Sequence, residues 1–339
     1  FSGLFATHPP ILKRIQALEP QFRADQLDEL QRRWLVSPPS GVDEDARLGL
    51  DDARVGKLPV DGAQFAVTPP MVVAQVAQPA SNDYRRADAI VCAIPQGLRA
   101  LAAQRETVMS LVLALLLDDA PAIAARQHAE IAARLGAPVA ADAQTVHDGA
   151  LAGLHPMLRL PLAALAFPVL RLRPRPELDV FMDTVHAVVH ADDQVSLFEY
   201  CLGRLLQTQL RESLDPARYA RLGRRKLSDV RSEISALLCV VAEAGSASAD
   251  DARRAYIAGI QRILPSDHLP YLPRPDVVQA LDPVWEPLDA LDPLAKQALI
   301  ESITAAISLD NQVTIAESEL LRTICAVLHC PLPPMLECV

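Results

Sequence analysis

The sequence predicts an all-α protein, and two observations lead to this fold class. Half of the 339 residues are apolar but only 4% are aromatic, and Ala and Leu dominate, a composition that favours packed helices over sheets. In addition, the stretch from Asp192 to Glu199 aligns with the stretch from Asp310 to Glu317 at a constant offset of 118 (310 − 192). The chain therefore contains a duplicated unit.

An apolar face at helical spacing precedes the acidic turn in both copies. It comprises Leu178, Phe181, Met182, Val185, Val188 and Val189 in the first copy, and Leu299, Ile300, Ile303 and Ile307 in the second. Because residues three and four apart share one face of a helix, each copy is predicted to be a helix, an acidic turn and a second helix. We expect residues 91–225 and 226–339 to form two similar helical-bundle units.

Two regions precede the repeat. Residues 1–36 are predicted to form two short helices: Pro9 suits the first turn of one helix, Pro20 ends it, and the other runs from 25 to 34. From 37 to 90, proline pairs, glycines and acidic clusters replace the helical period. This region is therefore predicted to be a linker that is partly disordered.

Further helices open each unit. They are predicted for residues 101–117 and 123–135 in the first unit, and near 230–243 and 250–264 in the second. The run from Asp118 to Pro121 stops the first helix, and Gly136 with Pro138 closes the second. The tripeptide that ends in Pro283 repeats the one that ends in Pro156 at an offset of 127 (283 − 156). The two copies thus differ by small insertions.

The charge of the chain argues against nucleic acid as a partner. The formal net charge is −10, which repels both nucleic acid and anionic lipid in the absence of a local basic patch. The basic residues that gather in one stretch are Arg211, Arg218, Arg221, Arg224, Arg225 and Lys226. We interpret this stretch as a solvated connecting face, because it lies between the two units and contains one aromatic residue.

The cysteines and apolar runs indicate the compartment. The six cysteines form no CxxC pair, and Cys201, Cys239 and Cys325 fall on apolar helix faces, which favours free thiols and a reducing compartment. The longest apolar run, 108–117, is too short to span a bilayer, and no signal peptide is visible. Since the chain begins with Phe1, we expect it to be part of a longer protein, and any membrane anchor would lie upstream.

The acidic turns allow two interpretations. Asp192 and Glu199, with Asp310 and Glu317 in the other copy, are candidate ligands for a divalent cation. However, Ser196-x-x-Glu199 and Thr314-x-x-Glu317 are both capping boxes, in which the hydroxyl and the carboxylate bind the free N–H groups at a helix start. Neither turn has the ligand series or the glycine of an EF-hand. Capping is the favoured interpretation.

A histidine pair is the remaining candidate metal site. His186 and His190 are four residues apart on one helix, the spacing of helical zinc pairs. The pair lacks the glutamate that activates water in such motifs, and the matching positions in the second copy are Thr304 and Ser308. We therefore interpret the histidines as a surface or partly buried pair, and expect no bound cofactor within this chain.

The N-terminal segment resembles a known protease family. The run from Ser2 to Pro10, followed by Arg14-Ile15 and Leu18, is similar to the segment that closes the catalytic domain of HtpX-like membrane-bound zinc metalloproteases (metallopeptidase family 48). In that family the zinc ligands, an H-E-x-x-H pair and a later Glu, precede this segment. The resemblance implies that residues 1–36 are the C-terminal end of a catalytic domain whose zinc ligands lie upstream. It also implies that His8 and Arg14 lie near the catalytic cleft.

The repeated units resemble TerB-like helical domains. The shared pattern is an apolar helix, an acidic A-D-G-x-[IV]-S turn and E-x-x-L-L-R, although Asp193 and Asn311 replace the glycine in this chain. Together the two resemblances favour the C-terminal portion of a membrane-anchored zinc metalloendopeptidase, located in a bacterial-type inner membrane with this region on the cytoplasmic side. Its partners would be protein or peptide substrates and a protein partner of the helical module. The rival hypothesis is a non-catalytic helical binding module without a protease.

Overall fold

The structure is a computed structural model that describes residues 90–192, 194–214, 223–273, 276–309 and 314–330, with residues 16, 20–26, 29 and 32 near the N-terminus. The chain divides into two compact units, residues 1–54 and 55–339. In the first unit, residues 24–26, 29 and 32 are helical, in line with the helix predicted from 25 to 34. His8, Arg14 and the predicted linker up to residue 89 lie outside the described residues.

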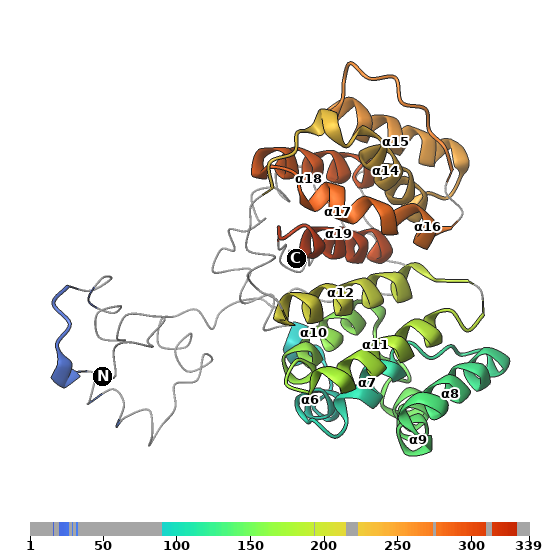
Figure 1. Ribbon diagram of the computed structural model, residues 1–339. Helices are drawn as coiled ribbons and strands as arrows, with labels where there is room; N and C mark the ends of the chain where they lie inside the picture. The colour runs from blue at the N-terminus through green and yellow to red at the C-terminus, as the bar shows by residue number, and fades with distance from the viewer. Residues whose placement is uncertain are drawn as a thin grey trace. The chain divides into compact units, whose positions relative to one another are not determined.

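Helices make up the described part of the second unit (Figure 1). Their bounds are α6 (Gln96–Ala103), α7 (Val108–Ala114), α8 (Pro121–Leu135), α9 (Ala137–Thr145), the π-helix η1 (Val146–Ala150), η2 (Pro156–Leu158), α10 (Arg159–Leu170), α11 (Arg175–Val189), α12 (Leu197–Leu214), η3 (Leu227–Asp229), α14 (Arg231–Gly245), α15 (Ala249–Ile263), α16 (Val277–Leu281), η4 (Asp282–Val284), α17 (Trp285–Asp289), α18 (Pro293–Ile307) and α19 (Ile315–Val327). The described residues form no β-strand, and a single bridge joins Arg225 to Leu291. The predicted all-α fold is confirmed.

The helix predicted from 101 to 117 is wrong as one element, because the chain turns between α6 and α7. Gln104 adopts an extended backbone conformation that ends α6. The Thr107 hydroxyl then donates a 2.8 Å hydrogen bond to the carbonyl of Leu101, which stabilises the turn. Every residue of α7 is buried, so this helix is the centre of the first half. The exposed pair Arg105 and Glu106 lies at the break, outside the core.

Gly136 ends α8, as the sequence predicts, but another helix follows at once. Its φ of 93° lies in the left-handed region, where a residue with a side chain is strained. Pro138 occupies the first turn of α9, where a missing N–H costs no helical hydrogen bond. The short, Ala-rich sequence of α9 carries little apolar periodicity, which explains why it was not predicted.

The order of helices in the first half recurs in the second. The series α7, α8, η2, α10, α11, α12 corresponds to α14, α15, η4, α17, α18, α19. The starts of α11 and α18, at 175 and 293, are 118 residues apart, as are the starts of α12 and α19, at 197 and 315. Packing recurs too, since α8 packs against α11 and α15 against α18. The repeated sequence thus produces repeated helix pairs.

The two halves meet through equivalent helices. The helix α12 of the first half packs along α19 of the second, and the two lie side by side in Figure 1. In addition, α12 packs against α16, and α19 packs against η2. Contacts of one element with its own counterpart are typical of an approximate two-fold arrangement. The Cys201 thiol of α12 bonds to Thr323 of α19, and burial raises the pKa of Cys201 to about 12.

A buried glutamine ties three elements of the first half together. The side chain of Gln127 in α8 is only 1% exposed. Its amide donates to the carbonyls of Leu116, at 3.0 Å, and Val188, at 3.2 Å, and its oxygen accepts from the N–H of Asp118 at 2.8 Å. Backbone groups at the ends of α7 and α11 are therefore satisfied by one side chain.

Replacing this glutamine should destabilise the helical unit. Gln127→Leu introduces an apolar side chain of similar size and leaves the buried carbonyls of Leu116 and Val188 without their donor. We therefore expect a loss of about 2 kcal/mol in the free energy of unfolding. Urea denaturation followed by circular dichroism measures it. Gln297→Leu, on the exposed face of α18, is the control. Equal midpoints for both variants would contradict this role of Gln127.

An ionic network joins the halves near the end of α19. His329 contacts Asp289 of α17 and Glu212 of α12, each at 2.9 Å, and Lys296 contacts Asp289 at 2.6 Å. The hydrogen bond to Asp289 is the main reason that the pKa of His329 is raised. Burial acts to raise the pKa of Asp289, but the hydrogen bonds from His329 and Lys296 outweigh it and leave that pKa lowered. The charged form of each group is thus favoured.

This network predicts a pH-dependent stability. Because the folded pKa of His329 is raised, its contribution is fully present below the ordinary histidine pKa of 6.5 and is lost as pH rises through the folded pKa. His329→Asn, which retains a side chain suited to the left-handed backbone at this position (φ 58°), should therefore lower the urea midpoint more at pH 6 than at pH 9. The exposed His268→Asn is the control. A pH-independent difference would disprove the assignment.

Candidate binding groove

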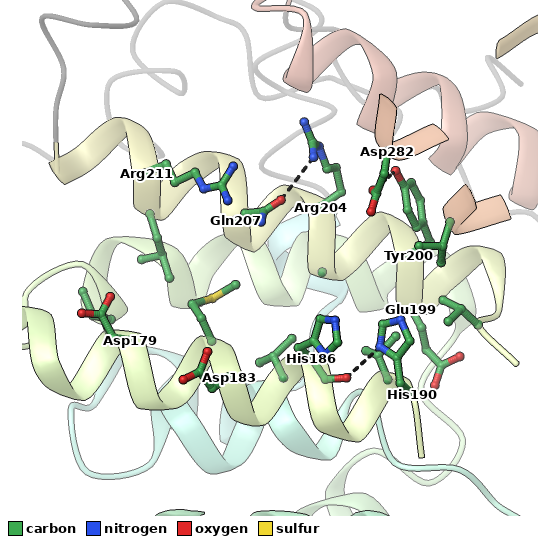
Figure 2. A pocket seen from close by; sticks show the side chains of 18 of the residues that line it. Asp179, Asp183, His186, His190, Glu199, Tyr200, Arg204, Gln207, Arg211 and Asp282 are labelled. Atoms are coloured by element: carbon green, nitrogen blue, oxygen red, sulfur yellow. Dashed lines mark hydrogen bonds between the residues drawn. The ribbon is translucent and has the colours of Figure 1, made fainter. Parts of the chain in front are cut away.

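A groove of about 530 Å³ runs between α11 and α12 and is closed at one side by α16 and η4 (Figure 2). Helix α11 contributes Leu178, Asp179, Met182, Asp183, Val185, His186, Val189 and His190, and α12 contributes Glu199, Tyr200, Gly203, Arg204, Gln207, Leu210, Arg211 and Leu214. Val195 lies in the turn between them, and Val278 and Asp282 come from the second half. The site is thus built on the first copy of the repeat and completed by the second.

The lining separates into a floor and two walls. We call the apolar side chains that α11, α12 and the turn between them contribute to the lining the floor; they are Leu178, Met182, Val185, Val189, Val195, Leu210 and Leu214. The α11 wall consists of Asp179, Asp183, His186 and His190, and the α12 wall consists of Arg204, Gln207 and Arg211 (Figure 2). The apolar stripe that the sequence identified on α11 supplies most of the floor. The polar residues beside it form an acidic end and a histidine end.

The α12 wall contains an arginine that is held in place. The Arg204 guanidinium lies 5.4 Å from the centre of the Trp285 ring and donates a 3.2 Å hydrogen bond to Gln207. Its Nε atom is buried and has no hydrogen-bond partner among the described residues. Burial is the main reason that the pKa of Arg204 is lowered, but an arginine stays charged in proteins. This side chain is therefore a fixed cation beside the groove.

A chain of hydrogen bonds fixes the end of the groove that faces the second half. The indole N–H of Trp285 donates to the Tyr200 hydroxyl at 2.7 Å, and this hydroxyl donates to Asp282 at 2.9 Å. Burial is the main cause of the raised pKa of Tyr200, so the hydroxyl keeps its proton. The bonds connect α12 with η4 and α17, which makes this end rigid.

The histidines of the α11 wall stack on each other. The rings of His186 and His190 are 4.1 Å apart and inclined by 15°. The Nδ1 of His190 donates to the carbonyl of His186 at 2.8 Å, since a carbonyl only accepts, and this leaves Nε2 as an acceptor. No set of three His, Cys, Asp or Glu side chains suited to a metal ion occurs in the part of the chain that the structure describes.

The acidic turns cap helices in both copies. In the first, the N–H of Ser196 donates to Glu199 at 2.9 Å and the N–H of Glu199 donates to the Ser196 hydroxyl at 3.2 Å. Thr314 and Glu317 make the same pair of bonds, at 2.8 and 3.2 Å. The predicted capping boxes are confirmed. Asp192 accepts a hydrogen bond from the N–H of Gln194, and the fourth cation candidate, Asp310, lies outside the described residues.

The two acidic turns differ in their surroundings. Glu199 lines the groove and is half-buried, and burial is the main reason that its pKa is raised. Glu317 is 7% exposed, because the end of α14 covers it at Gly245. A Cβ atom at Gly245 would overlap the Glu317 carboxylate, so any other residue there would require the Glu317 side chain to move. The groove at the first turn thus has no open counterpart at Glu317.

Sequence reasoning identified part of this site. It singled out His186, His190 and Glu199 and placed Arg204 in the repeat and Arg211 in the basic stretch, but it did not bring them together. Asp179, Asp183 and Gln207 were not singled out. Their signal is the regular spacing along each helix, 179–183–186–190 on one and 204–207–211 on the other.

Comparisons with known proteins assign no family to the chain. A scan against family models gave no match, and searches of curated proteins and of solved structures gave no significant match. Helices long and apolar enough to cross a bilayer are absent from the described residues. The cysteines described there are in no disulfide bond; they are Cys92, Cys201, Cys239, Cys325 and Cys330.

The capping boxes lead to a prediction about cations. Ser196→Ala removes the acceptor for the N–H of Glu199 and should cost about 1 kcal/mol of stability. Since the turn carboxylates are engaged in capping, adding calcium, magnesium or zinc should leave the melting temperature of the protein unchanged. Thermal denaturation with and without each cation measures both effects. A rise of several degrees with one cation would favour ligand binding over capping.

Proposed function

We propose that this chain is the C-terminal portion of a membrane-anchored zinc metalloendopeptidase and that residues 90–330 are its regulatory or interaction module. The resemblance of residues 2–18 to the end of the HtpX-like catalytic domain carries the protease part of this proposal. The groove between α11 and α12 supports the interaction part, because a pocket with an apolar floor and a few polar groups is the usual form of a binding site. The protein would be located in an inner membrane, with the module on the cytoplasmic side.

The described residues do not fit a catalytic zinc site. No three-ligand set is found among them, whereas a catalytic zinc needs three protein ligands and an open position. In the proposed protein the zinc would be held by upstream residues. The module would act on proteolysis through the partner it binds.

A non-catalytic helical binding module, similar to TerB-like domains and without a protease, is the second candidate. The specific observation in its favour is that the described residues contain a binding groove but no metal-binding set. The coding sequence upstream of Phe1 separates the two candidates. The protease requires an H-E-x-x-H helix and apolar spans of about 20 residues there. Their absence would leave the binding module as the function.

A substitution in the intact parent tests the N-terminal segment. By resemblance, His8 lies against the catalytic cleft, where it would face the substrate or donate a hydrogen bond to the oxyanion of the tetrahedral intermediate. Loss of such a donor reduces turnover by about a hundredfold or more. His8→Ala should therefore lower casein proteolysis by about this factor while the zinc content stays full, and His268→Ala should change neither. Unchanged turnover of His8→Ala would leave His8 as a residue that starts the helix and nothing more.

A further inference from the structure

We propose that the groove between α11 and α12 binds an amphipathic helix of a partner protein, with basic residues along the α11 wall and acidic residues along the α12 wall. This inference rests on the interaction role proposed above and names the class of partner. It does not depend on an attached protease, because every residue that carries it lies in the described helices.

The groove is long and narrow. Its lining runs from Leu178 to His190 along α11, a length of about 18 Å at the rise of an α-helix. Because α11 and α12 pack directly against each other, the space between them admits side chains but not a whole helix, which is roughly 10 Å wide. The occupant therefore inserts side chains and keeps its backbone above the groove.

A helix suits this groove better than an extended chain. The groove is lined by side chains of α11 and α12, whose backbone groups are paired within their own helices. An extended peptide over the apolar floor would leave its N–H and C=O groups without partners, which costs free energy. A helix satisfies its own backbone and places apolar side chains every three or four residues. An apolar stripe of about three turns matches the length of the floor.

The two walls carry opposite charges that form no ion pair with each other. Asp179 and Asp183 are one helical turn apart on the α11 wall, and Arg204 and Arg211 are two turns apart on the α12 wall. No ion pair joins the two walls in the described structure. Asp179, Asp183 and Arg211 are exposed, so they are accessible to a partner. Such charges select the partner and its orientation more than they add affinity.

The equivalent positions of the second half cannot form this site. The residues 118 positions after the α11 wall are Gln297, Glu301, Thr304 and Ser308, and those after Arg204 and Arg211 are Arg322 and His329. Arg322 is bound to Glu319 at 2.8 Å, and His329 is bound to Asp289 and Glu212. Glu301 is bound to Arg262. The charged side chains at these positions of the second half are thus paired within the fold, whereas those of the two groove walls do not pair with each other.

A glycine in the groove provides a way to block it. A Cβ atom at Gly203 would meet nothing within 4 Å, and Gly203 lines the groove from α12. Gly203→Trp therefore has room for its Cβ atom and places an indole at the groove, and it removes a helix-weakening glycine. Gly97 in α6 also has open space around its Cβ position and does not line the groove. Gly97→Trp is the matched control.

Binding of designed peptides tests the proposal. Three labelled peptides of about four helical turns share one leucine stripe and differ in its flanks, which carry Lys on one side and Glu on the other, Lys on both, or Glu on both. Fluorescence anisotropy with this chain should show that the mixed peptide binds most tightly. Gly203→Trp should weaken it by about tenfold or more, with an unchanged or higher melting temperature, and Gly97→Trp should bind normally.

Charge reversal gives an independent readout. Arg211→Glu makes the α12 wall more acidic and should shift the preference to the Lys-flanked peptide, whereas Asp183→Lys should shift it to the Glu-flanked peptide. Absence of binding by all three peptides, or equal binding by the wild type and Gly203→Trp, would overturn the proposal. The assay uses this chain alone and measures no proteolysis, so its failure would leave the protease proposal intact.

Discussion

The packing of α12 against α19 is the constraint on which the rest of the helical unit depends. Because each helix meets its own counterpart, α12 contacts the first half on one side and the second half on the other. It buries Tyr200, Cys201, Leu202, Leu206 and Leu210, of which Tyr200 and Leu210 also line the groove. Neither copy is completed by itself. Asp282 and Val278 of the second half close a groove that the first half begins.

A buried glutamate marks this contact. Glu319 of α19 is 9% exposed, its Oε1 contacts Arg322, and its Oε2 has no partner among the described residues. Burial is the main cause of its raised pKa. Burial of an incompletely paired carboxylate costs stability, and the equivalent residue of the first copy is the apolar Cys201. The duplicated helices have thus diverged at the interface, where a carboxyl group of α19 occupies the position of a thiol in α12.

Divergence after duplication also explains why one half carries an open groove. In both halves a helix pair is joined by a capped acidic turn, and the caps are chemically the same. In the second half, α14 covers Glu317 through Gly245, and the polar residues pair among themselves. In the first half the corresponding side chains line the groove and remain accessible. A shared fold therefore provides a scaffold in one half and a binding surface in the other.

The sequence by itself determined the local structure of this protein. Apolar periodicity defined the helices, Ser196 and Thr314 with their glutamates defined the caps, and Gly136 defined a helix end, because these features depend on residues within one or two turns. The tertiary structure decided what depends on distant residues. It broke the predicted helix at Gln104, placed Gln127 under two helix ends, and brought Arg204 over Trp285. Pairing of residues far apart in the chain, such as α12 with α19, has no local signature, and the groove is a product of that pairing.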